Sequence, residues 1–270
     1  MAEEEIKLEY EEPDKSIKEE IEKVEEAIEE GKQEKTVFDS SHWNPKTGLG
    51  KLVKEGRITD INEIMDKMVR ILEPEIVDSL IRDLKTDLLM VGQSKGKFGG
   101  GKRRVFRQTQ KKTQEGNKPK FATVAVVGNE DGFIGIGYGK AKETVPAREK
   151  SLRNAKIRIF KIRRGCGSWQ CGCKEPHSIP FAVLGKCGSA EIKLMPAPKG
   201  TGLKVESECQ KILRLAGIKD AWSKTRGQTG TKINLIYACE AALKQLIELK
   251  INPKKIESLG IVEGKIKPKE

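Results

Sequence analysis

The sequence predicts an α+β protein made of two folded units behind an acidic tail. Between about residues 75 and 160 the apolar spacing changes from helical to alternating and back, which is typical of strands enclosed by two helices. After a cysteine-rich stretch, short strands alternate with two apolar helices. With 270 residues, of which 36% are apolar, the chain can bury two modest cores.

Charge is divided unevenly along the chain. The net charge is +12, but residues 1–35 hold 15 acidic and 6 basic side chains, a balance of −9. The remainder holds 46 basic and 25 acidic side chains, a balance of +21. A body this basic predicts a polyanionic partner, with nucleic acid first among the candidates. No run approaches ~18 apolar residues, so we expect no membrane span.

Residues 1–36 are expected to form an acidic tail without a core of its own. Ile17, Ile21, Val24 and Ile28 recur at helical spacing, so the tail is either disordered or a thin amphipathic helix held by a partner. Its first residues lack the apolar run of a secretory signal and the arginines of a transit peptide, which predicts a cytoplasmic protein.

An N-terminal extension with helices is expected over residues 37–83. Asp60 and Glu63 fit a capping box at the start of one helix. Pro74 suits the first turn of a second helix, whose apolar stripe continues to Leu88.

The first unit is expected over residues 84–160. Phe121–Val127 and Phe133–Lys140 are predicted strands joined by a turn at Asn129–Gly132, and a helix follows from Pro146 to about Lys156.

A cysteine-rich loop, residues 161–178, leads to the second unit, residues 179–250, and a basic tail, residues 251–270. The predicted elements of the second unit are strands near 179–183, 190–195 and 221–225, a helix that stops at Gly217, and a helix over 235–249.

Three glycines alternate in one predicted strand. Gly135, Gly137 and Gly139 fall on one face, and bare strand faces indicate that something approaches closely. Either a helix packs on this face, or a nucleic-acid backbone approaches near Lys140 and Lys142. The pattern does not fit a dinucleotide-binding turn.

The most basic segment is residues 92–120, with ten basic residues against one acid. Flexible glycines beside arginines favour contact with a phosphate chain over a merely solvated loop. The candidate RNA-binding residues here are Lys97, Gly99, Gly100, Gly101, Lys102, Arg103, Arg104 and Arg107.

Cys166, Cys171, Cys173 and His177 fall within twelve residues. Three thiols and an imidazole are a ligand set for one structural Zn²⁺, and four protein ligands leave no open position for catalysis. Unligated thiols are the alternative, and Cys187 is an alternative ligand. Cys209 and Cys239 lie on apolar helix faces and are expected in the core.

Catalytic constellations are scarce. The chain has two histidines, and it lacks nucleophile-elbow, zinc-protease and kinase motifs. We therefore expect that the protein is not an enzyme.

Several motifs in combination resemble a known family. They are Trp43–Val53, Glu73–Asp78, Gly132–Glu143, the cysteine-rich loop, Gly185–Ser189, Pro196–Gly202 and Ala216–Asp220. Together they resemble the small-subunit ribosomal protein S5 family, closest to its archaeal branch, whose eukaryotic counterpart is small-subunit protein S2.

The resemblance implies an N-terminal α-β-β-β-α domain like a double-stranded-RNA-binding domain, and a C-terminal domain with a left-handed β-α-β crossover. It implies binding to small-subunit ribosomal RNA, contacts with proteins S4 and S8, a place at the messenger RNA entry path, support of translational accuracy, and no homo-oligomer. Beyond the Gly99–Arg104 turn, the candidate RNA contacts are Lys140, Lys142, Arg148, Arg153, Lys199 and Arg226.

The leading hypothesis is a non-enzymatic ribosomal RNA-binding protein with one structural zinc. Two rivals remain. An RNA-modifying enzyme needs a cofactor loop or an acid–base pair, and a zinc-containing DNA-binding regulator needs a recognition helix.

Overall fold

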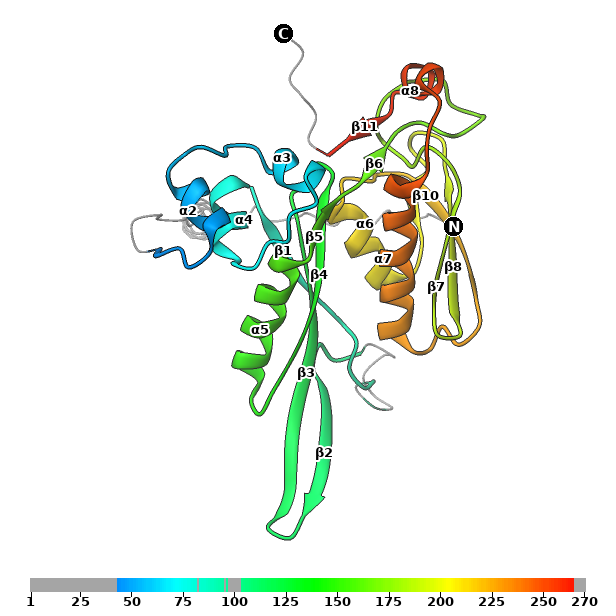
Figure 1. Ribbon diagram of the computed structural model, residues 1–270. Helices are drawn as coiled ribbons and strands as arrows, with labels where there is room; N and C mark the ends of the chain where they lie inside the picture. The colour runs from blue at the N-terminus through cyan, green and yellow to red at the C-terminus, as the bar shows by residue number, and fades with distance from the viewer. Residues whose placement is uncertain (1–42, 82, 95, 97–102, 265–270) are drawn as a thin grey trace, which may run out of the picture. The chain divides into compact units, whose positions relative to one another are not determined.

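The computed structural model describes residues 43–81, 83–94, 96 and 103–264. Helices and strands carry the labels of Figure 1. In the extension, Thr47 caps the first helix by accepting a hydrogen bond from the Gly50 backbone. The described part of the extension contains the short helices α2 (Gly48–Lys54), α3 (Ile61–Asp66) and α4 (Glu75–Leu80).

A five-stranded antiparallel sheet forms the first half of the body. Its longest strand, β3, pairs with β2 through its first half, and with β1 and β4 through its second half. The β2–β3 ribbon projects beyond the other strands (Figure 1). The strands are β1 (Lys85–Leu89), β2 (Arg107–Thr113), β3 (Gly116–Gly128), β4 (Phe133–Ala141) and β5 (Ile159–Lys161).

Helix α5 (Thr144–Ile157) packs on one face of this sheet, against the three alternating glycines of β4. A Cβ added to Gly135, Gly137 or Gly139 would lie closer than 3.0 Å to backbone atoms of α5. The glycines therefore let helix and strand approach, and the helix-packing alternative is confirmed.

The second sheet has the order β7-β8-β10-β9, with β9 and β10 parallel and the other pairs antiparallel. Helix α6 connects the parallel pair, so β9-α6-β10 is the β-α-β unit that the resemblance implies. Gly217 follows α6 with φ at +82°, a conformation that glycine adopts without strain, and the predicted stop is confirmed. The elements are β7 (Val183–Cys187), β8 (Ala190–Pro196), β9 (Leu203–Lys204), α6 (Ser207–Leu215), β10 (Ala221–Arg226) and α7 (Lys232–Glu248).

The two sheets share one hydrophobic core. Side chains of β3 and β4 such as Val126 and Ile136 belong to the same buried cluster as Ile212 of α6 and Leu243 of α7. Cys209 and Cys239 are fully buried in this cluster, as predicted. No helix within the described ranges is long and apolar enough to cross a membrane.

The tail after α7 is more ordered than its polar composition suggests. Asn252 caps α8 (Pro253–Leu259), and β11 (Val262–Glu263) pairs with β6 (Arg163–Arg164) just before the cysteine-rich loop. Buried Arg164 lies 2.5 Å from Asp131 and donates a second hydrogen bond to the carbonyl of Gly264. The chain therefore returns to the first unit after completing the second.

Three predictions about elements were wrong, and one strand was missed. The helical spacing of apolar residues up to Leu88 predicted a helix to that point, but α4 ends at Leu80. Residues 85–89 form β1 instead, because pairing with β3 outweighs the local pattern. Asp60 precedes α3 without a side-chain capping bond. The strand expected near 179–183 lies at 183–187. The basic segment contains a strand, β2, that periodicity did not show.

Candidate functional site

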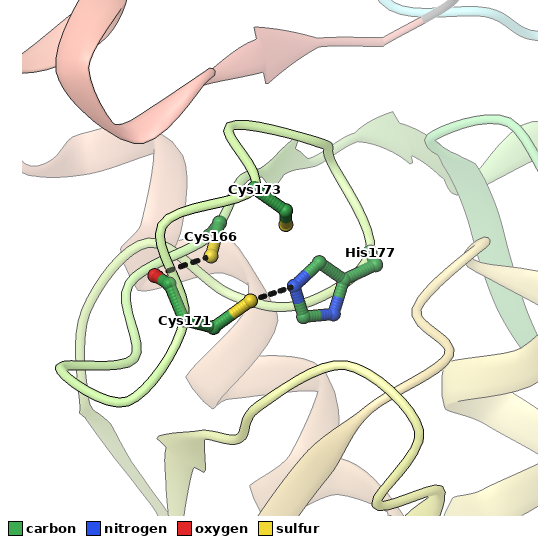
Figure 2. A group of neighbouring side chains, drawn as sticks. All are labelled: Cys166, Cys171, Cys173 and His177. Atoms are coloured by element: carbon green, nitrogen blue, oxygen red, sulfur yellow. Dashed lines mark hydrogen bonds between the residues drawn. The ribbon is translucent and has the colours of Figure 1, made fainter.

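The four residues with metal-ligand spacing lie together in one knuckle of the cysteine-rich loop (Figure 2). Their sulfur and nitrogen atoms all lie within 4.8 Å of one another, and Nε2 of His177 is 3.8 Å from Sγ of Cys171. In a tetrahedral zinc site with ordinary bond lengths, neighbouring ligand atoms are about 3.8 Å apart. The donor atoms are therefore close to the arrangement that one zinc ion requires.

Backbone contacts fix this knuckle at its base and against the end of α8. Gly165 and Ser178 form a bridge that closes its base, and the Cys166 backbone donates to the carbonyl of Leu259 at the end of α8. Gly167 lies against the carbonyl of Pro180, where a Cβ would clash, whereas Gly172 faces open space. Of these two glycines, Gly167 is therefore the one that the packing of the knuckle requires.

The thiols differ in their acidity. Burial, reinforced by the neighbouring sulfurs of Cys171 and Cys173, raises the pKa of Cys166 to about 11. Backbone N–H donation, chiefly from Lys199, lowers the pKa of Cys171 to about 6. Cys171 is thus the thiol that most readily supplies the thiolate that a metal binds.

The imidazole of His177 is fixed from its other side. Its Nδ1 lies 2.8 Å from Oδ2 of Asp220, and both side chains are about 95% buried. A carboxylate accepts hydrogen bonds and cannot donate, so Nδ1 is the donor of this bond, and Nε2 is the nitrogen that faces the Cys171 sulfur. Sequence spacing did not single out Asp220, because it lies 43 residues from His177.

Three thiols and one imidazole, with the imidazole orientation set by a carboxylate, fit a closed structural zinc site. Cys166, Cys171, Cys173 and His177 would hold the ion. Cys187 lies in β7 and is not part of this group.

The second candidate site is the basic surface of the first sheet. Arg103 and Arg107 line an open pocket of about 270 Å³, together with Lys232 at the start of α7. The Arg103 guanidinium donates to the carbonyl of Gly230 at 3.1 Å, and Arg104 is exposed. The other residues predicted for this turn, Lys97, Gly99, Gly100, Gly101 and Lys102, lie outside the described residues.

Strand register places Arg107 and Lys140 on one face. Arg107 pairs with Ala122 across β2 and β3, and Ala122 pairs with Lys140 across β3 and β4. Residues aligned across neighbouring strands point to the same side of a sheet, so these two cations stand two strands apart, about 10 Å. Both are exposed and lie on the face opposite α5.

The remaining candidates are exposed but lie on separate elements. Arg148 and Arg153 belong to α5, on the other face of the sheet, and Lys142 follows β4. Lys199 follows β8, whereas Arg226 ends β10 at the opposite end of the β8–β10 pair. The structure therefore groups Arg103, Arg107 and Lys140 and disperses the others.

Sequence reasoning missed four cations of the β2–β3 ribbon as site residues. Strand β3 is exposed up to Lys120 and β2 is exposed except at half-buried Thr109 and Thr113, so the ribbon's side chains do not form a core. The Glu115-Gly116 pair between two segments rich in threonine and lysine was the available signal of a hairpin turn. The missed residues are Lys111, Lys112, Lys118 and Lys120.

Comparisons with known proteins agree on one family. A family model described as "Ribosomal protein S5, N-terminal domain" matches residues 103–163, and "Ribosomal protein S5, C-terminal domain" matches residues 185–254. Three archaeal relatives are each named small ribosomal subunit protein uS5. The protein of Nanoarchaeum equitans is 47% identical over 83% of this chain and 96% of its own length. Those of Methanococcus maripaludis and Hyperthermus butylicus are 44% and 50% identical, over 88% and 75% of this chain and 97% and 89% of their own lengths.

Proposed function

The chain belongs to the ribosomal protein S5 family, whose members are structural constituents of the small ribosomal subunit, and from this premise we propose that it binds small-subunit ribosomal RNA through its first sheet. The observation that carries the proposal is the β2–β3 ribbon. It is exposed on both faces and holds five basic residues, Arg107, Lys111, Lys112, Lys118 and Lys120.

An isolated two-stranded ribbon gains little stability from its own contacts. Here only one of its cations has an internal ion pair among the described residues, Lys118 with Glu115. The other four are therefore available to phosphates. Together with Arg103 and Lys140 they form a basic surface that suits the backbone of structured RNA rather than the bases of a particular sequence.

We propose that the cysteine-rich knuckle holds one structural zinc ion. Four protein ligands would give the ion a closed shell, so its contribution is to hold the loop together, not to activate water. Buried Asp220 behind His177 supports this assignment, since outer carboxylates of this kind orient histidine ligands.

The finer aspects of the function rest on the family. We propose that the protein contacts S4 and S8, lies at the messenger RNA entry path, supports translational accuracy, acts in the cytoplasm and performs no catalysis. Neither rival, a DNA-binding regulator or an RNA-modifying enzyme, is favoured by a feature of the described residues. The dispersed cations of α5, together with Lys199 and Arg226, suit a protein surrounded by RNA on several sides.

RNA binding is tested with the full-length protein and small-subunit ribosomal RNA at several salt concentrations. Each phosphate neutralised should contribute about 0.7–0.9 to the slope of log K against log salt, so a steep negative slope is expected. Duplex DNA of equal length serves as competitor. Salt-independent binding, or a preference for the DNA, would overturn the proposal.

Zinc is tested by metal analysis of protein purified without added metal. We expect one zinc per chain and its loss in the Cys171→Ser, Cys173→Ser variant. A Cys187→Ser variant is the matched control, because Cys187 lies outside the knuckle and should leave the metal content unchanged. A wild-type protein without zinc would refute the assignment.

A further inference from the structure

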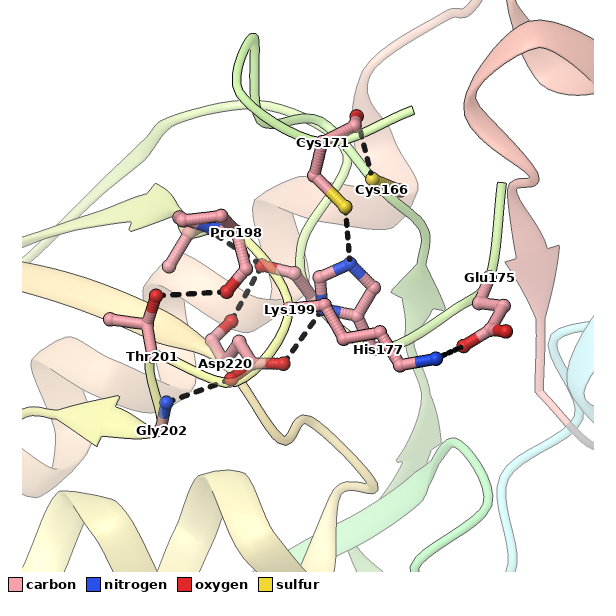
Figure 3. A network of polar contacts seen from close by, with 11 residues as sticks. Cys166, Cys171, Glu175, His177, Pro198, Lys199, Thr201, Gly202 and Asp220 are labelled. Atoms are coloured by element: carbon pink, nitrogen blue, oxygen red, sulfur yellow. Dashed lines mark hydrogen bonds and ion pairs between the residues drawn. The ribbon is translucent and has the colours of Figure 1, made fainter. Parts of the chain in front are cut away.

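Asp220 uses its two carboxylate oxygens in opposite directions (Figure 3). Oδ2 lies 2.8 Å from Nδ1 of His177, and Oδ1 accepts a hydrogen bond from the backbone of Gly202 at 2.8 Å. One buried side chain, about 5% exposed, therefore bridges the knuckle and the loop that follows β8, Pro196–Gly202.

Hydrogen bonds around Asp220 also join the knuckle to the Pro196–Gly202 loop. The carbonyl of His177 accepts hydrogen bonds from the backbones of Lys219 and Asp220, at 2.8 and 3.1 Å. The hydroxyl of Ser178 donates to the carbonyl of Asp220 and accepts from the backbone of Ala197, at 2.5 and 3.2 Å. Three segments far apart in sequence thus form one hydrogen-bonded unit.

Lys199 supplies a third link between the loop and the knuckle. Its ammonium lies 2.7 Å from the carboxylate of Glu175, which belongs to the knuckle. The loop contains no helix or strand between Pro196 and Leu203. Besides its own turn, in which Thr201 donates to the carbonyl of Pro198, these contacts hold its shape.

From these contacts we infer that Asp220 is the positioning residue of the metal centre and that metal occupancy sets the conformation of the Pro196–Gly202 loop, which presents Lys199 to RNA. The inference rests on the proposed zinc site. With zinc bound, His177 and Cys171 are fixed at their donor atoms, and Asp220 and Lys199 transmit that order to the loop. Without zinc, His177 and Cys171 lose their bonds to the ion, so Asp220 and Lys199 are anchored to a less rigid knuckle.

Amide hydrogen exchange of the full-length wild-type protein tests the coupling directly. Zinc-loaded and zinc-stripped samples are compared in peptides that cover residues 196–204. Removal of zinc should accelerate exchange at the Gly202 amide by at least about tenfold, while peptides of β2, on the ribbon that projects beyond the other strands, should not change. Equal exchange in this loop with and without zinc would overturn the coupling.

Asp220→Asn tests the positioning role. Asparagine keeps the size of the side chain but has one carbonyl oxygen, so it can accept from His177 or from Gly202 and not from both. Outer-ligand changes of this kind weaken metal binding by about 10–100-fold, which competition with a chromophoric chelator would measure. The visible spectrum of the cobalt-substituted protein would report altered ligand geometry.

The matched control is Glu208→Gln, a change at a carboxylate that is also about 5% exposed and accepts a backbone hydrogen bond, from Met90. It should leave zinc affinity and the cobalt spectrum as in the wild type. An equal loss in both variants, or none in Asp220→Asn, would overturn the positioning role. A wild-type protein that binds no zinc would overturn the zinc site and the inference with it, whereas a zinc-loaded wild type that fails only these tests overturns the inference alone.

Discussion

Gly137 of β4 lies against Ala155 of α5 so closely that a Cβ on the glycine would stand less than 3.0 Å from the alanine's backbone nitrogen. The carbonyl of Ser151, one turn earlier, is equally close to that position. The helix and the strand thus touch through main chain, in the middle of the face that the glycine stripe exposes.

Gly137→Ala should therefore destabilise the protein strongly. The new methyl group meets helix backbone on both sides and has no flexible side chain to displace, so α5 must move away from the sheet. We expect a loss of about 3 kcal/mol in the free energy of unfolding, the upper range for overpacking, as measured by urea denaturation.

Gly48→Ala is the matched control for that substitution. Gly48 begins α2 and a Cβ there meets nothing within 4 Å, so the change should be neutral or stabilising by up to about 1 kcal/mol. Similar losses in the two variants would show that the packing of α5 on β4 is not the cause.

Glu73→Gln should loosen the extension. The Glu73 carboxylate accepts hydrogen bonds from the Trp43 indole and from the backbones of Lys46 and Thr47. Glutamine replaces one accepting oxygen with a donor, so at least one of these donors loses its partner, at a cost of about 1–3 kcal/mol. Thermal unfolding at neutral pH, compared with Glu75→Gln, would measure it.

The same carboxylate predicts a pH dependence. Partial burial raises the pKa of Glu73, but hydrogen bonds from Thr47, Lys46 and Trp43 outweigh burial and lower it. A folded-state pKa below the unfolded value gives stability that is present above the unfolded pKa and is lost as pH falls through the folded pKa. The difference between wild type and Glu73→Gln should therefore shrink below about pH 4.3. A difference that is constant down to pH 3 would contradict this assignment.

Residue spacing was sufficient to predict a feature where a single short segment of the chain forms it. The alternating glycines of β4 predicted a close approach, and four ligand-type residues within twelve predicted a cluster, because both depend on neighbours in sequence. The strand at 85–89 was misread as helix, since Leu84 and Leu88 fit either period and only the partner strand β3 decides.

Contacts between distant segments were not predictable from the chain alone. Asp220 reaches His177 across 43 residues, and the pairing of β11 with β6 joins residues about 100 apart. The register that aligns Arg107 with Lys140 also needs three strands in place. Composition predicted a basic surface, and the fold selects which of its cations stand together.

Arg103→Glu with Arg104→Glu should weaken RNA binding and flatten its salt dependence. Reversing two charges near the Arg107–Lys140 face replaces two attractions to phosphate with two repulsions, and the slope of log K against log salt should become shallower by about 2. Of the two side chains, the structure gives only Arg103 a hydrogen bond, to Gly230, so the melting temperature should change little.

Lys67→Glu with Arg70→Glu changes the net charge by the same amount on the N-terminal extension. Both residues are exposed there. RNA affinity should fall much less than in the Arg103, Arg104 variant, and equal losses would show that net charge rather than this surface controls binding.

Chelation and ligand substitution should act through one site. If zinc stabilises the knuckle, a strong chelator should lower the melting temperature of the wild type, and Cys171→Ser with Cys173→Ser should lower it as well. A metal present at about 100 times its Kd contributes about 2.7 kcal/mol, which corresponds to at least roughly 5 °C in melting temperature for a chain of this size.

The chelator should then have no effect on the double variant, because the ion is already absent. An additional fall in the double variant would mean that the chelator acts elsewhere. A wild type indifferent to chelation, with a destabilised double variant, would mean that the two cysteines stabilise the loop by packing and not by binding a metal.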